Sequence, residues 1–256
     1  MHPPEARAKA LALVKDGLND CEIARRLGIP RRTILDWRRP TYVKKPPAAI
    51  CPRCWRPARP MRFTPDNYAE LLGFYLGDGH ISAGPRTQRL RITLDSKYPG
   101  IIESAREMLG RCFPSNPVGV VPYHDGSCVY VSVYSSHLHC LFPQHGPGRK
   151  HERRIRLEPW QHAAIDAGPW AFLRSCIWTD GCSFVNRTDI HRAEPYEYRS
   201  YQFSNMSKDI VNLFLDACDR VGVMARVNRS RRGLWEVRIN RRASVALMLE
   251  HVGLKE

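Results

Sequence analysis

The apolar positions divide the chain into three stretches with different periodicity. Over residues 1–40 they recur every three or four positions in short runs, which predicts small helices. Residues 41–65 are rich in Pro, Lys and Arg and lack such periodicity, which predicts an extended basic linker. From residue 66 onward, helical runs alternate with segments in which every second residue is apolar, so this part combines helices with strands.

The helices predicted within residues 1–40 have the spacing of a helix-turn-helix. Asp20 is placed to cap the second of three helices, and Pro30 stands in the first turn of the third. Ala24 is a small residue where the helices cross, and Gly28 is the glycine of the turn. Ile34 and Trp37 are the two apolar residues that seat the third helix. The exposed side of the third helix is almost wholly Arg, so we interpret this stretch as a DNA-binding domain rather than a generic three-helix bundle. The residues expected to enter the major groove are Arg31, Arg32, Thr33 and Arg38.

Two segments of the remaining chain resemble each other at a fixed offset. Residues 71–79 read Leu-Leu-Gly-Phe-Tyr-Leu-Gly-Asp-Gly, and residues 173–181 read Leu-Arg-Ser-Cys-Ile-Trp-Thr-Asp-Gly. Downstream of each, a Ser-Lys pair starts an amphipathic helix, over residues 98–109 and 209–221, and an alternating strand follows. Each half therefore predicts the order αββαββα, with the first half over residues 66–157 and the second over residues 158–256.

This pair of motifs resembles the LAGLIDADG homing endonucleases in their two-motif, single-chain form, and the resemblance covers residues 66–256. The segment 145–161 between the halves and the N-terminal helix-turn-helix resemble features of actinobacterial members. The resemblance implies an α+β fold, a pseudo-twofold tandem repeat after a small all-α domain, in a monomer that cleaves both DNA strands with a divalent metal. The first acid of the family motif is replaced by Leu76 and Trp178, whereas the acid that binds metal is kept as Asp78 and Asp180.

The motif residues themselves point to a close helix pair with a metal site at its end. Small residues recur four positions apart in both helices, as Gly73 and Gly77 and as Ser175 and Thr179, so the two backbones can share a seam. The seam brings Asp78 and Asp180 together at helix ends whose dipoles are also negative, which costs free energy unless a cation is bound. We expect Mg²⁺, with Mn²⁺ or Ca²⁺ able to take the same place, held by the two carboxylates with Gly77 and Thr179 beside them. Each helix is expected to end in Asp-Gly, with the aspartate in the last turn and glycine as the C-cap. The alternative is that Asp-Gly simply makes a turn.

The family also implies a basic residue at the edge of the active site, near the last strand of each half. Arg241 stands there in the second half, whereas Ser135 and Ser136 stand there in the first. The predicted catalytic residues are therefore Asp78, Asp180 and Arg241.

The alternating strands place polar side chains on one face of each sheet. In residues 88–95, for example, Arg and Thr alternate with Leu and Ile. Arg, Gln and Asn can make bidentate contacts with bases, so we interpret these faces as a surface that reads DNA, with a solvated sheet face as the alternative. The loops 187–192 and 228–232 are expected to meet phosphates. The residues assigned to DNA are Arg86, Arg89, Arg91, Arg187, Arg199, Gln202, Arg229, Arg231, Arg238 and Asn240.

The charge of the chain agrees with a polyanionic partner. Over 256 residues the formal net charge is +15, which favours double-stranded DNA first and an anionic membrane surface second. The chain has no apolar run long enough to span a membrane, and its first residues do not have the pattern of a signal peptide. We therefore expect a cytoplasmic, nucleoid-associated protein without a membrane partner.

The nine cysteines do not have the pattern of a disulfide framework. Cys51-Pro-Arg-Cys54 has the spacing of half a zinc site, but no second CxxC or HxxxH follows within the next thirty residues. A structural zinc would need two ligands from elsewhere, among Cys112, Cys128, His137, His139 and Cys140. We interpret the CxxC as two thiols in a loop, and the His and Cys residues near position 139 as packing or capping residues of a helix.

Together these observations predict a site-specific, metal-dependent double-strand DNA endonuclease. The alternative is a DNA-binding regulator that has kept this fold without cleaving. The retention of both Asp78 and Asp180 favours the nuclease.

Overall fold

The computed structural model describes residues 2–38, 49–51, 54, 57–58, 61–84, 87–188, 196–231 and 233–255. The chain forms two compact units, Met1–Ala48 and Ala49–Glu256. No helix in the described part of either unit has both the length and the apolar character needed to cross a bilayer.

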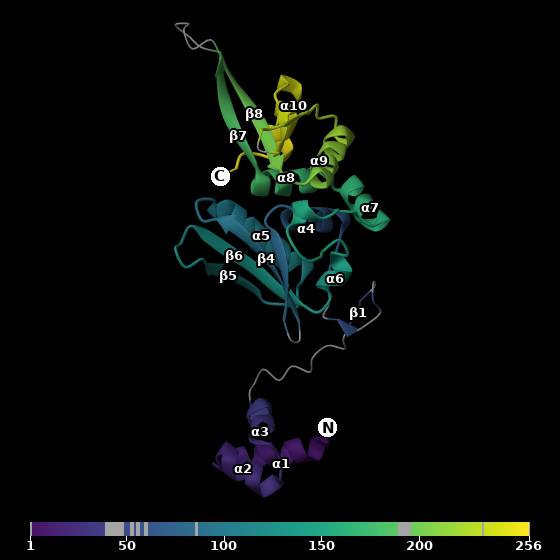
Figure 1. The fold of residues 1–256 in the computed structure, drawn as a ribbon. Helices are drawn as coiled ribbons and strands as arrows, with labels where there is room; N and C mark the ends of the chain where they lie inside the picture. The colour runs from purple at the N-terminus through teal and green to yellow at the C-terminus, as the bar shows by residue number, and fades with distance from the viewer. Residues whose placement is uncertain are drawn as a thin grey trace. The chain divides into compact units, whose positions relative to one another are not determined.

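The first unit is a small three-helix domain (Figure 1). Helices α1 (Pro4–Lys15), α2 (Asp20–Leu27) and α3 (Arg31–Arg38) enclose a core of Ala10, Ile23, Ile29 and Ile34, with Trp37 packed against it. The turn after α2 is as predicted, because Gly28 takes the left-handed conformation with φ 63°.

The cap of α2 differs from the sequence prediction. Asn19, rather than Asp20, is the N-cap: its side-chain oxygen accepts from the backbone N–H groups of Cys21 and Glu22, and the Glu22 carboxylate accepts from the N–H of Asn19. Asp20 is the first helical residue, and its carboxylate pairs with the Arg38 guanidinium at 3.3 Å. The carboxylate therefore ties α2 to the end of α3.

The second unit contains the predicted repeat. Its first half runs α4 (Pro65–Leu76), β3 (Gly79–Ala83), β4 (Gln88–Asp95), α5 (Pro99–Cys112), β5 (Val118–Pro122), β6 (Cys128–Ser135) and α6 (Leu138–Leu141). Its second half runs α8 (Pro169–Asp180), β7 (Gly181–Thr188), β8 (Tyr196–Asn205), α9 (Lys208–Arg220), β9 (Arg226–Arg229), β10 (Trp235–Ile239) and α10 (Arg242–His251). The 3-10 helix η1 (Lys150–Glu152) and α7 (Pro159–Ala167) lie between the halves, and the strands β1 (Ala49–Ile50) and β2 (Pro57–Ala58) pair ahead of α4.

The two halves have the same sheet topology. The strand orders are β3-β4-β6-β5 and β7-β8-β10-β9, and every neighbouring pair is antiparallel. In each central pair, buried residues stand opposite each other, as Ile92 does to Val131 and Phe203 to Val237. The predicted fold class, a helix-turn-helix followed by the tandem αββαββα repeat of the LAGLIDADG fold, is confirmed.

The motif helices α4 and α8 form the centre of this unit, between the two sheets (Figure 1). Every residue of α4 from Tyr68 to Leu76 is buried, which is expected of a helix covered on all sides. One hydrophobic core runs through both halves, and α5 and α9 pack on it from their own sheets.

The hairpin of β7 and β8 is longer than the sequence predicts. β7 continues to Thr188, so Arg187 lies in a strand opposite Glu197 rather than in a loop. An ion pair of 2.6 Å between the two side chains extends the pairing. The rest of the predicted phosphate-binding loop, residues 189–192, lies outside the described residues.

Candidate active site and nucleic-acid surface

The seam between α4 and α8 depends on small residues. A Cβ atom at Gly73 would collide with the Ser175 hydroxyl and approach the Phe172 carbonyl oxygen to 2.9 Å, and one at Gly77 would collide with Thr179. The two hydroxyl groups donate within their own helix, from Ser175 to the Phe172 carbonyl at 2.9 Å and from Thr179 to the Ser175 carbonyl at 2.9 Å. Polar side chains are thus buried at the seam without unsatisfied donors. The structure brings all four predicted interface residues together.

Of the glycines after the motif aspartates, Gly181 is the C-cap of α8, as predicted, whereas Gly77 rather than Gly79 is the C-cap of α4. Gly181 has φ −117° and ψ 174°, an extended conformation, and Gly79 already belongs to β3. A Cβ on either glycine would collide with the preceding turn of its helix, 2.8 Å from the Tyr75 carbonyl oxygen for Gly79 and 2.7 Å from the Ile177 Cα for Gly181. Glycine is needed because the strand that follows each motif helix begins in contact with the last turn of that helix. This close contact fixes the position of the aspartate between helix and strand.

Asp78 and Asp180 are brought together where these helices end. Burial raises the pKa of both carboxyl groups, and the charge of Asp180 raises that of Asp78 further, to about 6. Asn205 donates its side-chain N–H to Asp180 at 2.7 Å. The Asp78 carboxylate makes no hydrogen bond or ion pair with any residue that the structure describes. A carboxylate that is mostly buried, unpaired and close to a second one is a strong candidate for a proton or a cation.

Two lysines provide the positive charge at this site. Lys150, from η1, donates to the carbonyl oxygens of Tyr75 at 2.6 Å and Leu76 at 2.9 Å, and also to that of Gly77. Lys255, near the end of the chain, donates to Thr179 at 2.9 Å and Gly181 at 3.1 Å. These are carbonyl groups at helix ends, which attract cations.

The lysines and the aspartates also affect each other's protonation. The charges of Lys150 and Lys255 lower the pKa of both carboxyl groups, against the larger effect of burial. Burial in turn lowers the pKa of Lys150 to about 8 and also lowers that of Lys255. The site therefore holds two carboxylates and two ammonium groups in a poorly solvated space.

These contacts change the roles expected of Gly77, Thr179 and Arg241. The carbonyl oxygens of Gly77 and Thr179, expected beside a metal, accept from lysine ammonium groups. Arg241 is the exposed N-cap of α10, and its guanidinium contacts the Met224 sulfur at 2.9 Å. The cations that act on the aspartates are the two lysines, so the structure does not bring Arg241 to the site as predicted.

A hollow of about 520 Å³ opens beside the aspartates. The segment between the two halves lines it with basic side chains, and Asp180 and Asn205 also line it. The basic and imidazole side chains in its wall are His80, His145, Arg149, Lys150, His151 and Arg153. Burial and the charge of Arg153 lower the pKa of His145 to about 4, so that imidazole is neutral at physiological pH. The hollow has the charge that a phosphodiester requires.

The polar face of the first sheet matches the prediction. Leu90, Ile92 and Leu94 face the core, whereas Arg89 and Arg91 lie on the other face with the side chains of β6. The Arg91 guanidinium lies 4.5 Å from the centre of the Tyr130 ring, and Arg89 donates to the Ser132 hydroxyl at 3.1 Å. The two arginines are therefore held on a surface that also contains aromatic rings. Arg86 lies outside the described residues.

The residues assigned to DNA in the second sheet are divided between its two faces. Gln202 stands opposite Arg238, and these two share a face. The strand register places Arg187, Arg199 and Arg229 on the other face, the one that carries the buried Tyr201 and Phe203.

Arg226, which the sequence did not assign to DNA, and Asn228 share the face of Arg238. The predicted phosphate-binding loop over residues 228–232 is shorter than expected, because Asn228 and Arg229 belong to the strand β9. The register of the short strand β9 could not be derived from its sequence. Asn240 and Arg231 are exposed beyond strand ends.

The candidate DNA-reading residues of α3 are accessible. Arg31 and Arg32 are exposed, and Thr33 is half-buried. Arg32 pairs with Asp36 on its own helix at 3.6 Å, and Arg38 pairs with Asp20. Of the three arginines, Arg31 makes no ion pair with the described residues.

The lysines were the functional residues that sequence reasoning missed. Lys150 lies 73 residues after Gly77, and Lys255 lies 76 residues after Thr179, so the two follow matched motif positions at almost the same interval. A comparison of the repeats extended beyond the last strands would have found this match.

Comparisons with known proteins give one sequence match and several structural likenesses. A family model described as a homeodomain-like domain matches residues 2–39, which include the three helices of the first unit. No curated protein matches the chain in sequence.

Among solved structures, the chain is similar to variants of the homing endonuclease I-DmoI, with 16% identity, a TM-score of 0.49 and coverage of 73% of this chain and 89% of that one. It is similar to the LAGLIDADG meganuclease I-AabMI bound to uncleaved DNA, with 15% identity, a TM-score of 0.46 and coverage of 74% and 83%. It is also similar to the N-terminal LAGLIDADG domain of WhiA, with 14% identity, a TM-score of 0.44 and coverage of 76% and 86%.

Proposed function

We propose that this protein is a DNA endonuclease that cuts both strands at a specific site with a divalent cation held by Asp78 and Asp180. The observation that carries the proposal is the Asp78 carboxylate, which is mostly buried and makes no hydrogen bond or ion pair with the described residues. Burial and the charge of Asp180 both raise its pKa. Hard carboxylate oxygens suit Mg²⁺, Mn²⁺ or Ca²⁺, so the donor set fits such an ion. When bound, the ion would lower the pKa of a water nucleophile and stabilise the departing oxygen.

The other residues of the site have roles that follow from their charge. Asn205 holds the Asp180 carboxylate in place through its 2.7 Å hydrogen bond. Lys150 and Lys255 supply positive charge next to the carboxylates, where a phosphodiester would add negative charge. The basic wall formed by Arg149 and Arg153 would hold the DNA backbone in the hollow.

Sequence recognition would be divided between two surfaces. Arg89 and Arg91 in one sheet and Gln202 and Arg238 in the other are side chains able to contact base edges. The α3 helix of the first unit, with Arg31 and Arg32 exposed, would read a separate stretch of the major groove. A monomer with two unlike sheets would then bind an asymmetric double-stranded target.

A second candidate function, a DNA-binding regulator that does not cleave, is favoured by one observation. The ammonium groups of Lys150 and Lys255 already bond to the helix-end carbonyl groups and lie close enough to the aspartates to lower their pKa. Two positive and two negative groups balance each other without a metal. In a protein that had lost cleavage, the two lysines would then take the place of a metal in compensating the charge of the carboxylates.

A cleavage selection separates the two functions. A library of duplexes with randomised sequence is incubated with the full chain and Mg²⁺, and new ends are captured and sequenced. The endonuclease predicts a recurrent pair of ends that disappears with EDTA and in an Asp78→Asn Asp180→Asn double variant. Sequence-selective retention of duplexes on the protein, without any new ends in Mg²⁺ or Mn²⁺, would overturn the endonuclease and support the regulator.

A further inference from the structure

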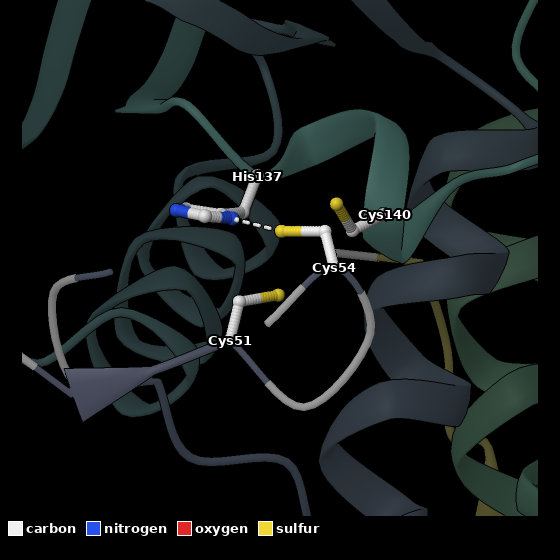
Figure 2. A group of neighbouring side chains, drawn as sticks. All are labelled: Cys51, Cys54, His137 and Cys140. Atoms are coloured by element: carbon white, nitrogen blue, oxygen red, sulfur yellow. Dashed lines mark hydrogen bonds between the residues drawn. The ribbon is translucent and has the colours of Figure 1, made fainter. Parts of the chain in front are cut away.

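Four side chains with soft ligand atoms converge beside the first half, away from the aspartate site. They are Cys51, Cys54, His137 and Cys140, and their side chains point into a common space (Figure 2). All four ligand atoms lie within 4.8 Å of one another, and the Cys54 sulfur is 3.2 Å from Nδ1 of His137.

The local structure positions these ligands in two pairs with the same spacing. Cys51 directly follows β1, and Cys54 lies in a turn three residues later. His137 is the N-cap of α6 and Cys140 lies in its single turn, where the Cys140 N–H donates to the His137 carbonyl at 3.1 Å. Each pair has two residues between its members, a spacing typical of zinc ligands.

The burial of the cluster distinguishes it from cysteines scattered on a surface. Cys51 is fully buried and His137 is 4% exposed, whereas Cys54 and Cys140 are partly exposed. Three thiols and an imidazole gathered in this way gain little from packing alone, because each presents its polar atom to the others. A cation at the centre would satisfy all four.

We propose that Cys51, Cys54, His137 and Cys140 bind one Zn²⁺ as a closed, tetrahedral structural site. Zinc bonds of about 2.3 Å to sulfur and about 2.0 Å to nitrogen place neighbouring ligand atoms about 3.8 Å apart or slightly closer. The observed distances bracket this value, from 3.2 Å between the Cys54 sulfur and Nδ1 of His137 up to a limit of 4.8 Å for the cluster. Shifts of about 1 Å or less would therefore bring the four atoms to the distances of a zinc site. All four positions are filled by protein groups, so the zinc is structural.

The zinc joins parts of the chain that are distant in sequence. Cys54 and His137 are separated by 83 residues, so the ion fixes the segment that precedes α4 to the end of the first sheet. The CxxC segment therefore belongs to the second unit, which begins at Ala49. The sequence offered His137 and Cys140 only as two of five candidate partners for the CxxC, and the absence of a second pair within thirty residues favoured two thiols in a loop.

The zinc site is independent of the proposed endonuclease site. Thiolates and imidazole select Zn²⁺, whereas the carboxylates of Asp78 and Asp180 select hard ions such as Mg²⁺. The two classes of ligand therefore keep the two metals apart within one domain. Loss of cleavage would leave the zinc site unaffected.

The test is the metal content of the full chain, purified under reducing conditions without chelators. We expect one equivalent of zinc per chain by elemental analysis. Replacing zinc with Co²⁺ should give the visible absorption of a tetrahedral ion together with thiolate-to-cobalt charge-transfer bands. Cys54→Ser and Cys140→Ser should lower the zinc content to background, whereas Cys128→Ser, a half-buried cysteine of the same half, should leave it unchanged.

Wild-type measurements keep the test decisive even if a ligand variant fails to fold. A wild-type chain that purifies without zinc and gives no cobalt charge-transfer bands would overturn the site. So would a Cys51–Cys54 disulfide found by alkylation and mass spectrometry, or a Cys140→Ser protein with full zinc content. Asp78→Asn should keep its zinc, which shows that the metal measured is not the one proposed for cleavage.

Discussion

Lys150 and Lys255 occupy equivalent places at the ends of the two motif helices. Lys150 donates to the Leu76 carbonyl of α4 and Lys255 to the Thr179 carbonyl of α8, both at 2.9 Å. Each comes from the chain that follows the last strand of its own half, and each acts on both aspartates. The repeat thus includes a cation as well as an acid.

Replacement of Lys150 should destabilise the protein. In Lys150→Met, the carbonyl groups at the end of α4 lose their donor and the carboxylates lose a compensating charge, so we expect a loss of about 1–3 kcal/mol in the free energy of unfolding. Chemical denaturation at pH 7 without divalent ions measures it. Lys97→Met is the matched control, because Lys97 is exposed and its described contacts are an ion pair with Asp95 and the ring of Tyr98, away from the aspartate site. Equal stability of the two variants would show that Lys150 does not compensate the negative charge of the two carboxylates.

Substitution of either aspartate should separate cleavage from binding. Asp78→Asn or Asp180→Asn removes a ligand of the proposed metal, so double-strand cleavage should disappear. DNA affinity should stay within about tenfold of wild type, or about 1.4 kcal/mol, because the binding surfaces are untouched. Cleavage and gel-shift assays on the selected target test this, and full cutting by either variant would contradict the assignment.

The raised pKa of Asp78 predicts a specific pH dependence. Because the folded value is about 6 and the ordinary value is 3.8, the folded, metal-free protein holds a proton more tightly than the unfolded chain. The contribution of protonated Asp78 to the stability of the fold is fully present below pH 4 and is lost as the pH rises through 6. Affinity for Mg²⁺ should increase over the same interval, because the metal requires the carboxylate.

Urea denaturation at closely spaced pH values measures this effect. In Asp78→Asn the free energy of unfolding should change less with pH between pH 4 and 6. At pH 7 without metal, the variant should be more stable than wild type by at most about 3 kcal/mol. A variant whose pH profile overlays that of wild type would show that Asp78 titrates normally.

The helix seam predicts a large difference between two glycines. Leu at Gly77 would push against Thr179 and separate α4 from α8, at a cost of about 1–3 kcal/mol or more, and the aspartates would move apart. Gly110, near the end of α5, has no atom within 4 Å of an added Cβ, so Gly110→Leu should be mild. Thermal melts and cleavage assays compare the two. A Gly77→Leu protein that melts and cuts like wild type would exclude the close seam.

Removal of residues 1–40 should weaken the salt dependence of DNA binding. The deleted domain carries exposed arginines such as Arg31. Without them the protein neutralises fewer phosphates and releases fewer counterions, so the plot of log affinity against log salt becomes less steep. Cleavage chemistry should remain, since the aspartates and lysines lie in the second unit. An unchanged salt slope would mean that the first unit does not bind DNA.

The sequence predicted what depends on local periodicity and repetition. The matched Asp-Gly motifs and alternating strands gave the order of elements in both halves, and the small residues identified the helix seam. Side-chain contacts between distant segments could not be predicted in this way. Lys150 and Lys255 reach helix ends more than seventy residues earlier, and Cys54 meets His137 across 83 residues.

The strand register was the other feature that the sequence did not predict. Arg199 and Gln202 are three positions apart in one strand, so they must face opposite sides of the sheet, and the pairing with β10 shows which side is polar. A basic residue near a strand was therefore not sufficient to assign it to the DNA surface.

Each half contains its own small-residue helix, its own acid and its own trailing lysine. Residues 66–157 alone thus carry every component that one side of the aspartate site requires, and two copies could in principle form a symmetric dimer. Such a dimer would present two identical sheets and would select a palindrome. In this chain the two halves are covalently joined, so their sheets need not be identical. The DNA target proposed for them therefore need not be a palindrome, although both halves contribute to one aspartate site.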